Sequence, residues 1–276
     1  MTFISNIHIK NDEFLELRDL IYDYSAISIQ DAKKYLLENR LSNRIRFLNF
    51  SSFKDYIYYL KYDSNKNSEM EVLLNLITIN ETYFLRELPQ MQYLVDIVMP
   101  ELLAKGKRNI RIWSAACSTG EEPYSLAILF TNAGFYNKAK IDIIGTDINS
   151  EVIKAAIKGE YRSMSFRGVP YGFEENFSKA QSIYTLHDDI RQKVTFRTAN
   201  LISPAMPAII GKVDVIFCRN VIIYFDQEGK QKVVNMFYNA LNQPGYLFLG
   251  HSESMYKLSS SYTVTNFGKG LVHVKL

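Results

Sequence analysis

Short apolar runs alternate with amphipathic segments from about Asn109 to the end of this 276-residue chain. One of the runs, residues 213–218, carries few polar residues, which is typical of a parallel strand buried on both faces. Strands that alternate with helices predict an α/β fold with a doubly wound sheet and helices on both of its faces. The predicted strands are 110–115, 141–145, 213–218 and 246–250, and the predicted helices are 122–132, 150–157 and 227–241.

Two regions depart from this alternation. Residues 262–267 and 271–274 flank Gly268-Lys269-Gly270, which predicts a hairpin and an antiparallel edge at the C-terminal end of the sheet. Residues 160–198 interrupt the alternation, and they hold a predicted strand pair at 182–186 and 193–197. We interpret this region as a small β insert on the main sheet.

The N-terminal part of the chain has a different texture, because its apolar residues recur at helical spacing. Phe14, Leu17 and Ile21 mark one helix, and Ser52 is a candidate N-cap for another. A polar linker at 63–68 precedes a helix at 69–78. We therefore expect an all-α domain over 1–78 and a second domain over 79–276.

Composition narrows the class of protein. The hydrophobic content of 47% and the charged content of 22% are ordinary for a soluble globular protein. A net charge of +3 does not by itself imply nucleic acid, and no apolar run reaches the ~18 residues that span a bilayer. The start lacks the features of a signal peptide, and Cys117 and Cys218 make neither a disulfide framework nor a metal site. We expect a reduced, cytoplasmic, monomeric protein.

Three polar clusters follow predicted strands, at the sheet edge where open α/β folds bind ligands. They are Ser118-Thr119-Gly120-Glu121-Glu122, Asp147, and Arg219-Asn220. An acid at the end of a second strand can accept both hydroxyls of a ribose. Each cluster also has a structural interpretation: acids at a helix N-terminus, a cap for the next helix, and a salt bridge at the rim. The glycine spacing fits neither a dinucleotide nor a nucleoside-triphosphate loop.

Taken together, the motifs resemble the CheR-type chemoreceptor glutamate O-methyltransferases. The segments that carry the resemblance are Asn-x-Thr-x-x-x-Arg at 80–86, Ser-Thr-Gly-Glu-Glu-Pro-Tyr-Ser at 118–125, Gly-Thr-Asp-Ile-Asn at 145–149, Arg-Asn-Val-Ile-Ile-Tyr-Phe at 219–225 and Gly-His-Ser-Glu-Ser at 250–254. The resemblance implies the cofactor S-adenosylmethionine (SAM), transfer of its methyl group to receptor glutamates, and the product S-adenosylhomocysteine.

The resemblance also implies roles for individual residues. The methionine end would be lined by Asn80, Thr82 and Arg86, and Arg86 would hold the methionine carboxylate. Glu121 would take the ammonium group, and Asp147 would bind the ribose. The remaining assignments are Asn200 and Leu201 around the adenine, Arg219 and Asn220 closing the pocket, and Tyr224 beside the transferred methyl.

Lys33, Arg40 and Arg44 form a basic stripe on a predicted helix over 31–50. One interpretation is a solvated helix face. The other, which the resemblance favours, is docking to an acidic receptor helix by charge complementarity.

Two other functions remain open. A nucleic-acid methyltransferase would be expected to carry an Asn/Asp-Pro-Pro-Tyr-like motif, but residues 219–225 contain no proline. A non-catalytic SAM-sensing module would keep the pocket and lose the substrate surface. We expect no metal and no nucleic-acid partner.

Overall fold

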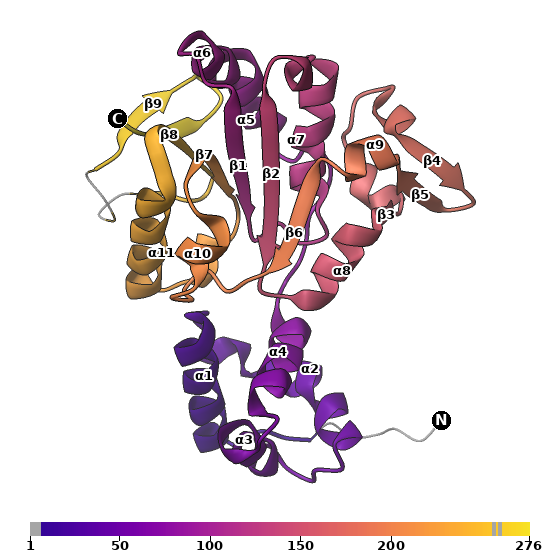
Figure 1. The fold of residues 1–276 in the computed structure, drawn as a ribbon. Coiled ribbons are helices and arrows are strands. Elements are labelled where there is room, and N and C mark those ends of the chain that lie inside the picture. Colours follow the sequence, from indigo (N-terminus) through magenta and orange to yellow (C-terminus); the bar gives the residue numbers. More distant parts are fainter. Residues whose placement is uncertain (1–6, 256–257, 259–260) are drawn as a thin grey trace. The chain divides into compact units, whose positions relative to one another are not determined.

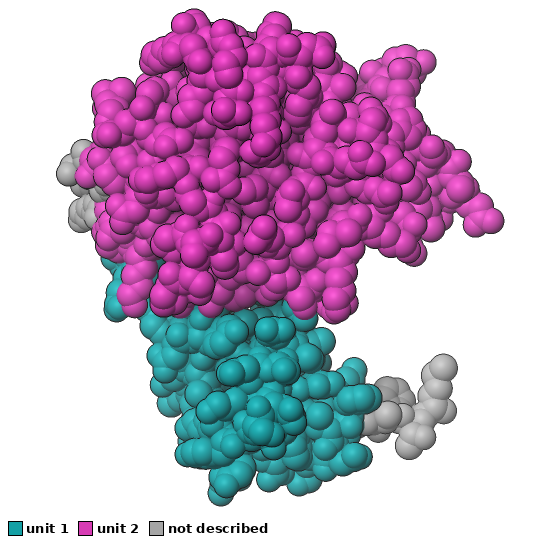
Figure 2. All heavy atoms as spheres, viewed as in Figure 1, with its two compact units in different colours: residues 1–79, 224–229 teal, residues 80–223, 230–276 magenta. Residues whose placement is uncertain are grey.

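The computed structural model describes residues 7–255, 258 and 261–276. The chain forms two compact units (Figure 2). The first comprises Met1–Ile79 and Tyr224–Gly229, and the second comprises Asn80–Ile223 and Lys230–Leu276. No helix among the described residues is long and apolar enough to cross a membrane.

The first unit is helical. Its elements are α1 (Asn11–Ser25), η1 (Asp31–Lys33), α2 (Lys34–Phe47), α3 (Phe53–Tyr62) and α4 (Lys66–Ile77). Ser52 caps α3, since its side chain accepts a hydrogen bond from the Asp55 amide. The polar linker expected over 63–68 is shorter than predicted, because α4 already begins at Lys66. Polar residues there lie in the exposed first turn of α4, where apolar periodicity gives no signal.

Residues Tyr224–Gly229 pack with these helices although they follow a strand of the second unit in sequence. The Ser28 amide donates to the Tyr224 carbonyl (2.8 Å), and Ile27 forms an antiparallel bridge with Phe225. The Tyr22 hydroxyl donates to Asp226 Oδ2 (2.9 Å). The helical unit therefore fixes the backbone on either side of Phe225.

The second unit contains a seven-stranded sheet in the order β6-β2-β1-β7-β8-β10-β9 (Figure 1). Strands β6, β2, β1, β7 and β8 are parallel, and β10 pairs antiparallel with both β8 and β9. This confirms the doubly wound α/β fold with an antiparallel C-terminal hairpin. The strands are β1 (Asn109–Ala115), β2 (Lys140–Asp147), β6 (Val194–Thr198), β7 (Val213–Cys218), β8 (Leu241–Leu249), β9 (Thr263–Asn266) and β10 (Leu271–Lys275).

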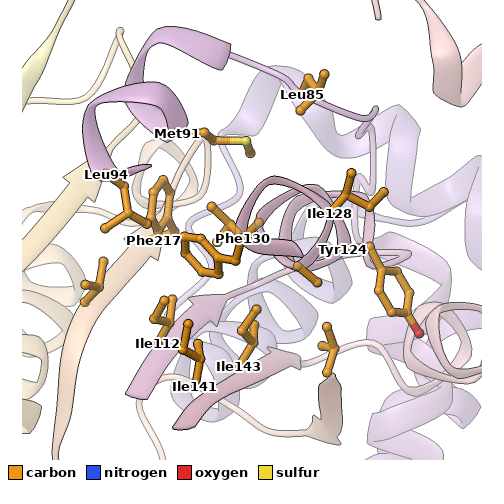
Figure 3. Close-up of a cluster of buried hydrophobic side chains, with 14 of the residues drawn as sticks. Leu85, Met91, Leu94, Ile112, Tyr124, Ile128, Phe130, Ile141, Ile143 and Phe217 are labelled. Carbon is orange, nitrogen blue, oxygen red and sulfur yellow. The ribbon is translucent and has the colours of Figure 1, made fainter. Parts of the chain in front are cut away.

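Apolar side chains bury both faces of this sheet. On one face, Phe130 and Ile128 of a helix lie over Ile112 and Ile143 of the central strands (Figure 3). On the other face, the Trp113 ring contacts Phe237 edge-on, with centroids 5.3 Å apart. The helices of this unit are α5 (Leu88–Tyr93), the π-helical η2 (Leu94–Val98), α6 (Met99–Ala104), α7 (Glu121–Asn132), α8 (Ser150–Lys158), α9 (Asp188–Arg191), α10 (Met206–Ile210) and α11 (Gln227–Ala240).

The β insert differs from the prediction. Its three strands, β3 (Glu160–Tyr161), β4 (Phe177–Ala180) and β5 (Ile183–Leu186), form a separate sheet in the order β3-β5-β4, outside the β6 edge of the main sheet (Figure 1). The expected pairing of 182–186 with 193–197 is wrong, because β6 pairs in parallel with β2. Alternation of apolar residues identified β6 as a strand but does not say which sheet it joins.

Candidate active site

Four adjacent strands, β6, β2, β1 and β7, bring their carboxyl ends to one edge of the sheet. The chain winds outward from β1 in both directions, so the boundary between β1 and β7 is the topological switch point. At or just beyond these strand ends lie Asn200 after β6, Asp147 as the last residue of β2, Glu121 as the first residue of the helix that follows β1, and Arg219 after β7. The sequence-predicted polar clusters thus meet at one edge.

The turn after β1 is tightly constrained. The Ser118 amide donates to Asp147 Oδ2 (2.9 Å), and the Ser118 hydroxyl donates to the Asn80 carbonyl (2.8 Å). Gly120 has φ 89°, and a Cβ there would lie 2.9 Å from the Cβ of Ala156. Only glycine fits both the backbone conformation and the space. One turn thus joins the end of β2 to the segment that begins at Asn80.

Glu121 opens α7 and is 2% exposed. Its carboxylate accepts hydrogen bonds from Thr119 Oγ1 (2.6 Å) and Ser165 Oγ (2.9 Å). None of the ion pairs within the described part of the chain involves Glu121, and its burial raises the pKa of its carboxyl group. A buried carboxylate with hydroxyl donors and no cation is suited to a positively charged ligand group.

Asp147 ends β2 and is buried. Its Oδ1 accepts a hydrogen bond from the Asn149 amide (2.9 Å), and burial raises the pKa of its carboxyl group. The capping of α8 falls to Asn149, whose side chain accepts from the amides of Glu151 and Val152. The capping interpretation therefore applies to Asn149, which leaves Asp147 as the acid at the strand end.

Asn200 and Leu201 lie beside Asp147, because the Ala199 amide donates to the Asp147 carbonyl (2.8 Å). The Asn200 side chain accepts from the Ile202 amide (3.1 Å), which shapes the turn after β6. Leu201 is buried and presents apolar surface at this turn. The structure thus brings both residues to the same edge as the β2 acid.

Arg219, at the end of β7, has a side chain only 2% exposed. Its Nε donates to Glu122 Oε2 (2.6 Å), and its Nη1 donates to the Arg86 carbonyl (2.6 Å). Ser114 Oγ donates to the other oxygen of Glu122 (2.6 Å). Arg219 therefore positions the backbone of the Arg86 segment. The sequence analysis allowed a salt bridge for Arg219 without naming the partner, and the structure shows that this partner is Glu122.

The segment from Asn80 to Glu87 is held at several points. The Leu85 amide donates to Ser125 Oγ (2.9 Å), and the Phe84 amide donates to the Ser165 carbonyl (2.8 Å). Arg86 is half-buried, and its Nη1 donates to the Glu81 carbonyl (3.1 Å). Thr82 is also half-buried in this segment.

Glu253 was not assigned a role from the sequence, although it lies in the Gly-His-Ser-Glu-Ser motif. Its carboxylate accepts four backbone hydrogen bonds, from the amides of Gly250 (2.6 Å), Asn220 (2.9 Å), Val221 (2.8 Å) and Ile222 (2.9 Å). This arrangement, which we call the Glu253 clamp, joins the loop after β8 to the loop after β7. Asn220 Oδ1 is buried and has no hydrogen-bond partner among the residues that the structure describes.

Backbone strain gathers at the same edge. Non-glycine residues with left-handed φ values there are Leu85 (57°), Glu87 (53°), Ala116 (58°), Ser118 (51°) and Asn220 (61°). Such conformations are costly for residues other than glycine, and they cluster at ligand sites. The strain is an independent sign that this edge binds a ligand.

The remaining residues that were assigned a role from the sequence lie in the helical unit; they are Tyr224, Lys33, Arg40 and Arg44. Tyr224 ends η6 (Ile222–Tyr224) and packs there through its carbonyl. Arg40 donates to the carbonyls of Ile77 and Thr78 at the end of α4 (2.5 and 3.2 Å), and Lys33 is exposed.

Arg44 has partners inside the helical unit. It forms two hydrogen bonds with Glu69 (2.9 and 2.5 Å), whose side chain is 3% exposed. Tyr56 donates to the same carboxylate (2.8 Å). Arg44 therefore neutralises the charge of the buried Glu69 carboxylate, and it would do so whether or not it also contacts a receptor.

The strand order, with one reversed strand next to the edge, and the acids near the carboxyl ends of β1 and β2 are those expected of a SAM-dependent methyltransferase. Family models give the particular family: residues 80–270 match the CheR methyltransferase SAM binding domain, and residues 12–78 match the CheR methyltransferase all-alpha domain. The chain belongs to the CheR methyltransferase family, and its cofactor is SAM.

Full-length relatives are similar to this chain. Chemotaxis protein methyltransferase 2 of Vibrio cholerae is 37% identical, covering 99% of this chain and 96% of the relative. The chemotaxis protein methyltransferase of Borreliella burgdorferi is 34% identical, covering 92% of each. Chemotaxis protein methyltransferase 2 of Pseudomonas aeruginosa is 33% identical, covering 95% of this chain and 92% of the relative.

The residues present fit this cofactor. SAM carries an ammonium group, a carboxylate and a ribose diol. The buried carboxylates of Glu121 and Asp147 suit the ammonium and the diol, and the unpartnered Oδ1 of Asn220 can accept a further hydrogen bond. This set of hydrogen-bond acceptors is therefore complementary to the ammonium and hydroxyl groups of SAM.

Proposed function

We propose that this protein transfers the methyl group of SAM to glutamate side chains in the cytoplasmic helices of chemoreceptors, forming methyl esters. The observation that carries the proposal is the match to both CheR domains, together with relatives named chemotaxis methyltransferases over nearly their full length. The receptor helices are the proposed partner, the cytoplasm is the proposed location, and a monomer is the proposed working form.

We assign the cofactor contacts from the chemistry of each side chain. The Arg86 guanidinium pairs with the methionine carboxylate, and the Glu121 carboxylate pairs with the ammonium. The Asp147 carboxylate accepts the ribose hydroxyls. The remaining contacts come from Asn80 and Thr82 at the methionine end, Asn200 and Leu201 at the adenine, and Asn220 at the closing side, where Arg219 acts by positioning the Arg86 segment.

The reaction needs little acid–base chemistry from the protein. When bound, SAM would supply a methyl group on a sulfonium, from which the neutral thioether of S-adenosylhomocysteine is a good leaving group. A glutamate carboxylate, with a free pKa of about 4.3, is already ionised at neutral pH and attacks without a general base. The protein contributes alignment, which is worth about 7–11 kcal/mol in well-oriented reactions. We assign Tyr224 to the position beside the transferred methyl.

The basic stripe of Lys33, Arg40 and Arg44 is the proposed docking surface for acidic receptor helices. Arg40 and Arg44 hold partners within the helical unit, so reversing their charge would disturb the unit as well as the surface. Lys33 is exposed, and it gives the cleaner test. We expect Lys33→Glu to raise the KM for receptor fragments severalfold, more strongly at low salt, while SAM affinity is unchanged.

The matched control is Lys54→Glu, which makes the same charge change at an exposed position of α3. An equal rise in KM in both variants would show that net charge, and not the stripe, governs receptor binding.

Peptide mapping by mass spectrometry tests the substrate assignment. The purified protein is incubated with SAM and a cytoplasmic chemoreceptor fragment, and the digested fragment is searched for methylated residues. Methyl groups confined to glutamate are expected, and they should be absent when Arg86→Ala replaces the wild-type protein. Methylation of lysine or another residue would refute the glutamate assignment. SAM binding with no receptor methylation would favour a non-catalytic SAM-sensing module.

A further inference from the structure

Ser165 lies between the β insert and the proposed cofactor pocket. It belongs to the short 3₁₀ helix η4 (Ser163–Phe166), which follows strand β3 of the insert. Its hydroxyl donates to Glu121 Oε1 (2.9 Å), and its carbonyl accepts the Phe84 amide (2.8 Å). One residue thus contacts both the α7 side of the pocket and the Asn80–Glu87 segment.

Aromatic packing reinforces this connection. The Phe84 ring lies among four rings of the insert region, with centroid distances of 4.7 Å to Tyr161, 5.2 Å to Phe166, 5.5 Å to Phe173 and 5.1 Å to Phe177. The Tyr161 hydroxyl also donates to the Thr119 carbonyl in the turn after β1 (2.9 Å). The insert therefore packs directly against both segments that contribute to the pocket.

We propose that Ser165 is a positioning residue for SAM binding: its hydroxyl orients and helps to ionise the Glu121 carboxylate, and so links the β insert to the cofactor pocket. This inference rests on the proposed role of Glu121 as the partner of the ammonium group. A hydrogen bond to the ionised carboxylate stabilises the charged form, which is the form that binds a cation. Because the coupling is reciprocal, SAM binding should also order the insert.

Burial raises the pKa values of two carboxyl groups of the proposed pocket, Glu121 and Asp147, so the NMR measurement on Glu121 is needed to separate its titration from that of Asp147. Thr119 and Ser165 are neutral hydroxyls. Burial raises the pKa values of Tyr161 and Cys117 well above their usual range, so both stay neutral near pH 7. Loss of the Ser165 hydroxyl should therefore raise the pKa of Glu121 further, because one of its two hydroxyl donors is removed.

The variants Ser165→Ala, Ser165→Thr and Ser163→Ala separate this role from a structural one. Ser165→Ala keeps the backbone bond to Phe84 and removes only the hydroxyl. Ser165→Thr restores the hydroxyl, and Ser163→Ala removes an exposed hydroxyl from the same turn. The dissociation constant for SAM is measured by calorimetry across pH, and the pKa of Glu121 is measured by carbon NMR on the ligand-free protein.

We expect Ser165→Ala to weaken SAM binding about tenfold, the range of one charge-assisted hydrogen bond. The pH below which SAM affinity falls, and the pKa of Glu121 measured by NMR, should both move to higher values. Ser165→Thr should restore both, and Ser163→Ala should match the wild type. An unchanged Glu121 pKa in Ser165→Ala would overturn the proposal, even if SAM binding weakened. SAM binding and the Glu121 pKa are measured without a receptor. Failure of this inference can therefore be told apart from failure of the proposed methyl transfer to receptors.

Hydrogen exchange gives the reciprocal measurement on the wild-type protein. SAM should slow amide exchange at Phe84 and through residues 160–187, and it should do so less in Ser165→Ala. Equal protection in the two proteins would contradict the link between insert and pocket.

Discussion

The Glu253 clamp allows a prediction whose size follows from its hydrogen bonds. Glu253 is 9% exposed, and each of its two carboxylate oxygens accepts two backbone amides. In Glu253→Gln, one oxygen is replaced by an NH₂ group that faces two N–H donors. An unsatisfied buried donor costs about 1–3 kcal/mol, so the loss should be about 3–5 kcal/mol after some relaxation of the loop.

The clamp should affect cofactor binding as well as stability. It holds Asn220 in a left-handed conformation (φ 61°) that the loop would otherwise leave. We therefore expect Glu253→Gln to lower the melting temperature by about 6–20 °C, taking about 2–4 °C per kcal/mol for a domain of this size. SAM affinity measured at a temperature where the variant is folded should fall in parallel.

The matched control is Glu174→Gln, because Glu174 is exposed in the insert. It should change stability by less than about 0.5 kcal/mol. Thermal unfolding followed by circular dichroism, and calorimetric titration with SAM, measure both effects. A Glu253→Gln protein that melts within 2 °C or so of the control and binds SAM normally would refute the reasoning.

Three further predictions concern other contacts. Because burial raises the pKa of Glu121, SAM affinity should fall as the pH drops through that pKa. Glu121→Gln should bind SAM weakly, and the pH dependence that remains in calorimetric titrations should be that of Asp147, whose pKa burial also raises. Arg44→Met leaves the buried Glu69 without its cation and should destabilise the helical unit by about 3 kcal/mol in urea unfolding, with SAM affinity unchanged, whereas Lys54→Met, at an exposed position of α3, should be nearly neutral. Tyr224→Phe should slow methyl transfer in single-turnover assays while SAM binding stays intact, and equal loss of both would refute its assigned role.

Much of the fold follows from local sequence signals. The β7 strand is apolar except for Asp214, and the Ser52 cap and the Gly268-Lys269-Gly270 hairpin each depend on a few neighbouring residues, so their positions could be predicted. The assignment of β6 to the insert failed because strand pairing is a long-range property: Val194 pairs with Ile143, far away in sequence. Apolar alternation carries no information about such partners.

The candidate site shows the same limit. The polar residues after β1, β2 and β7 could be identified because parallel strands end at one edge of a sheet. The partners of these residues could not, since Glu122 meets Arg219 and Ser165 meets Glu121 only after the chain has folded. The Glu253 clamp also joins residues from separate loops, and the sequence showed only that Glu253 lies in a polar motif.

The most direct test of the central claim is the release of volatile methanol from a labelled receptor. The protein is incubated with methyl-labelled SAM and cytoplasmic chemoreceptor fragments, and the washed fragments are treated with mild alkali. A glutamate methyl ester predicts label on the receptor that alkali releases as methanol. Label that survives alkali, or no label on the receptor while calorimetry shows normal SAM binding in the same sample, would contradict the account.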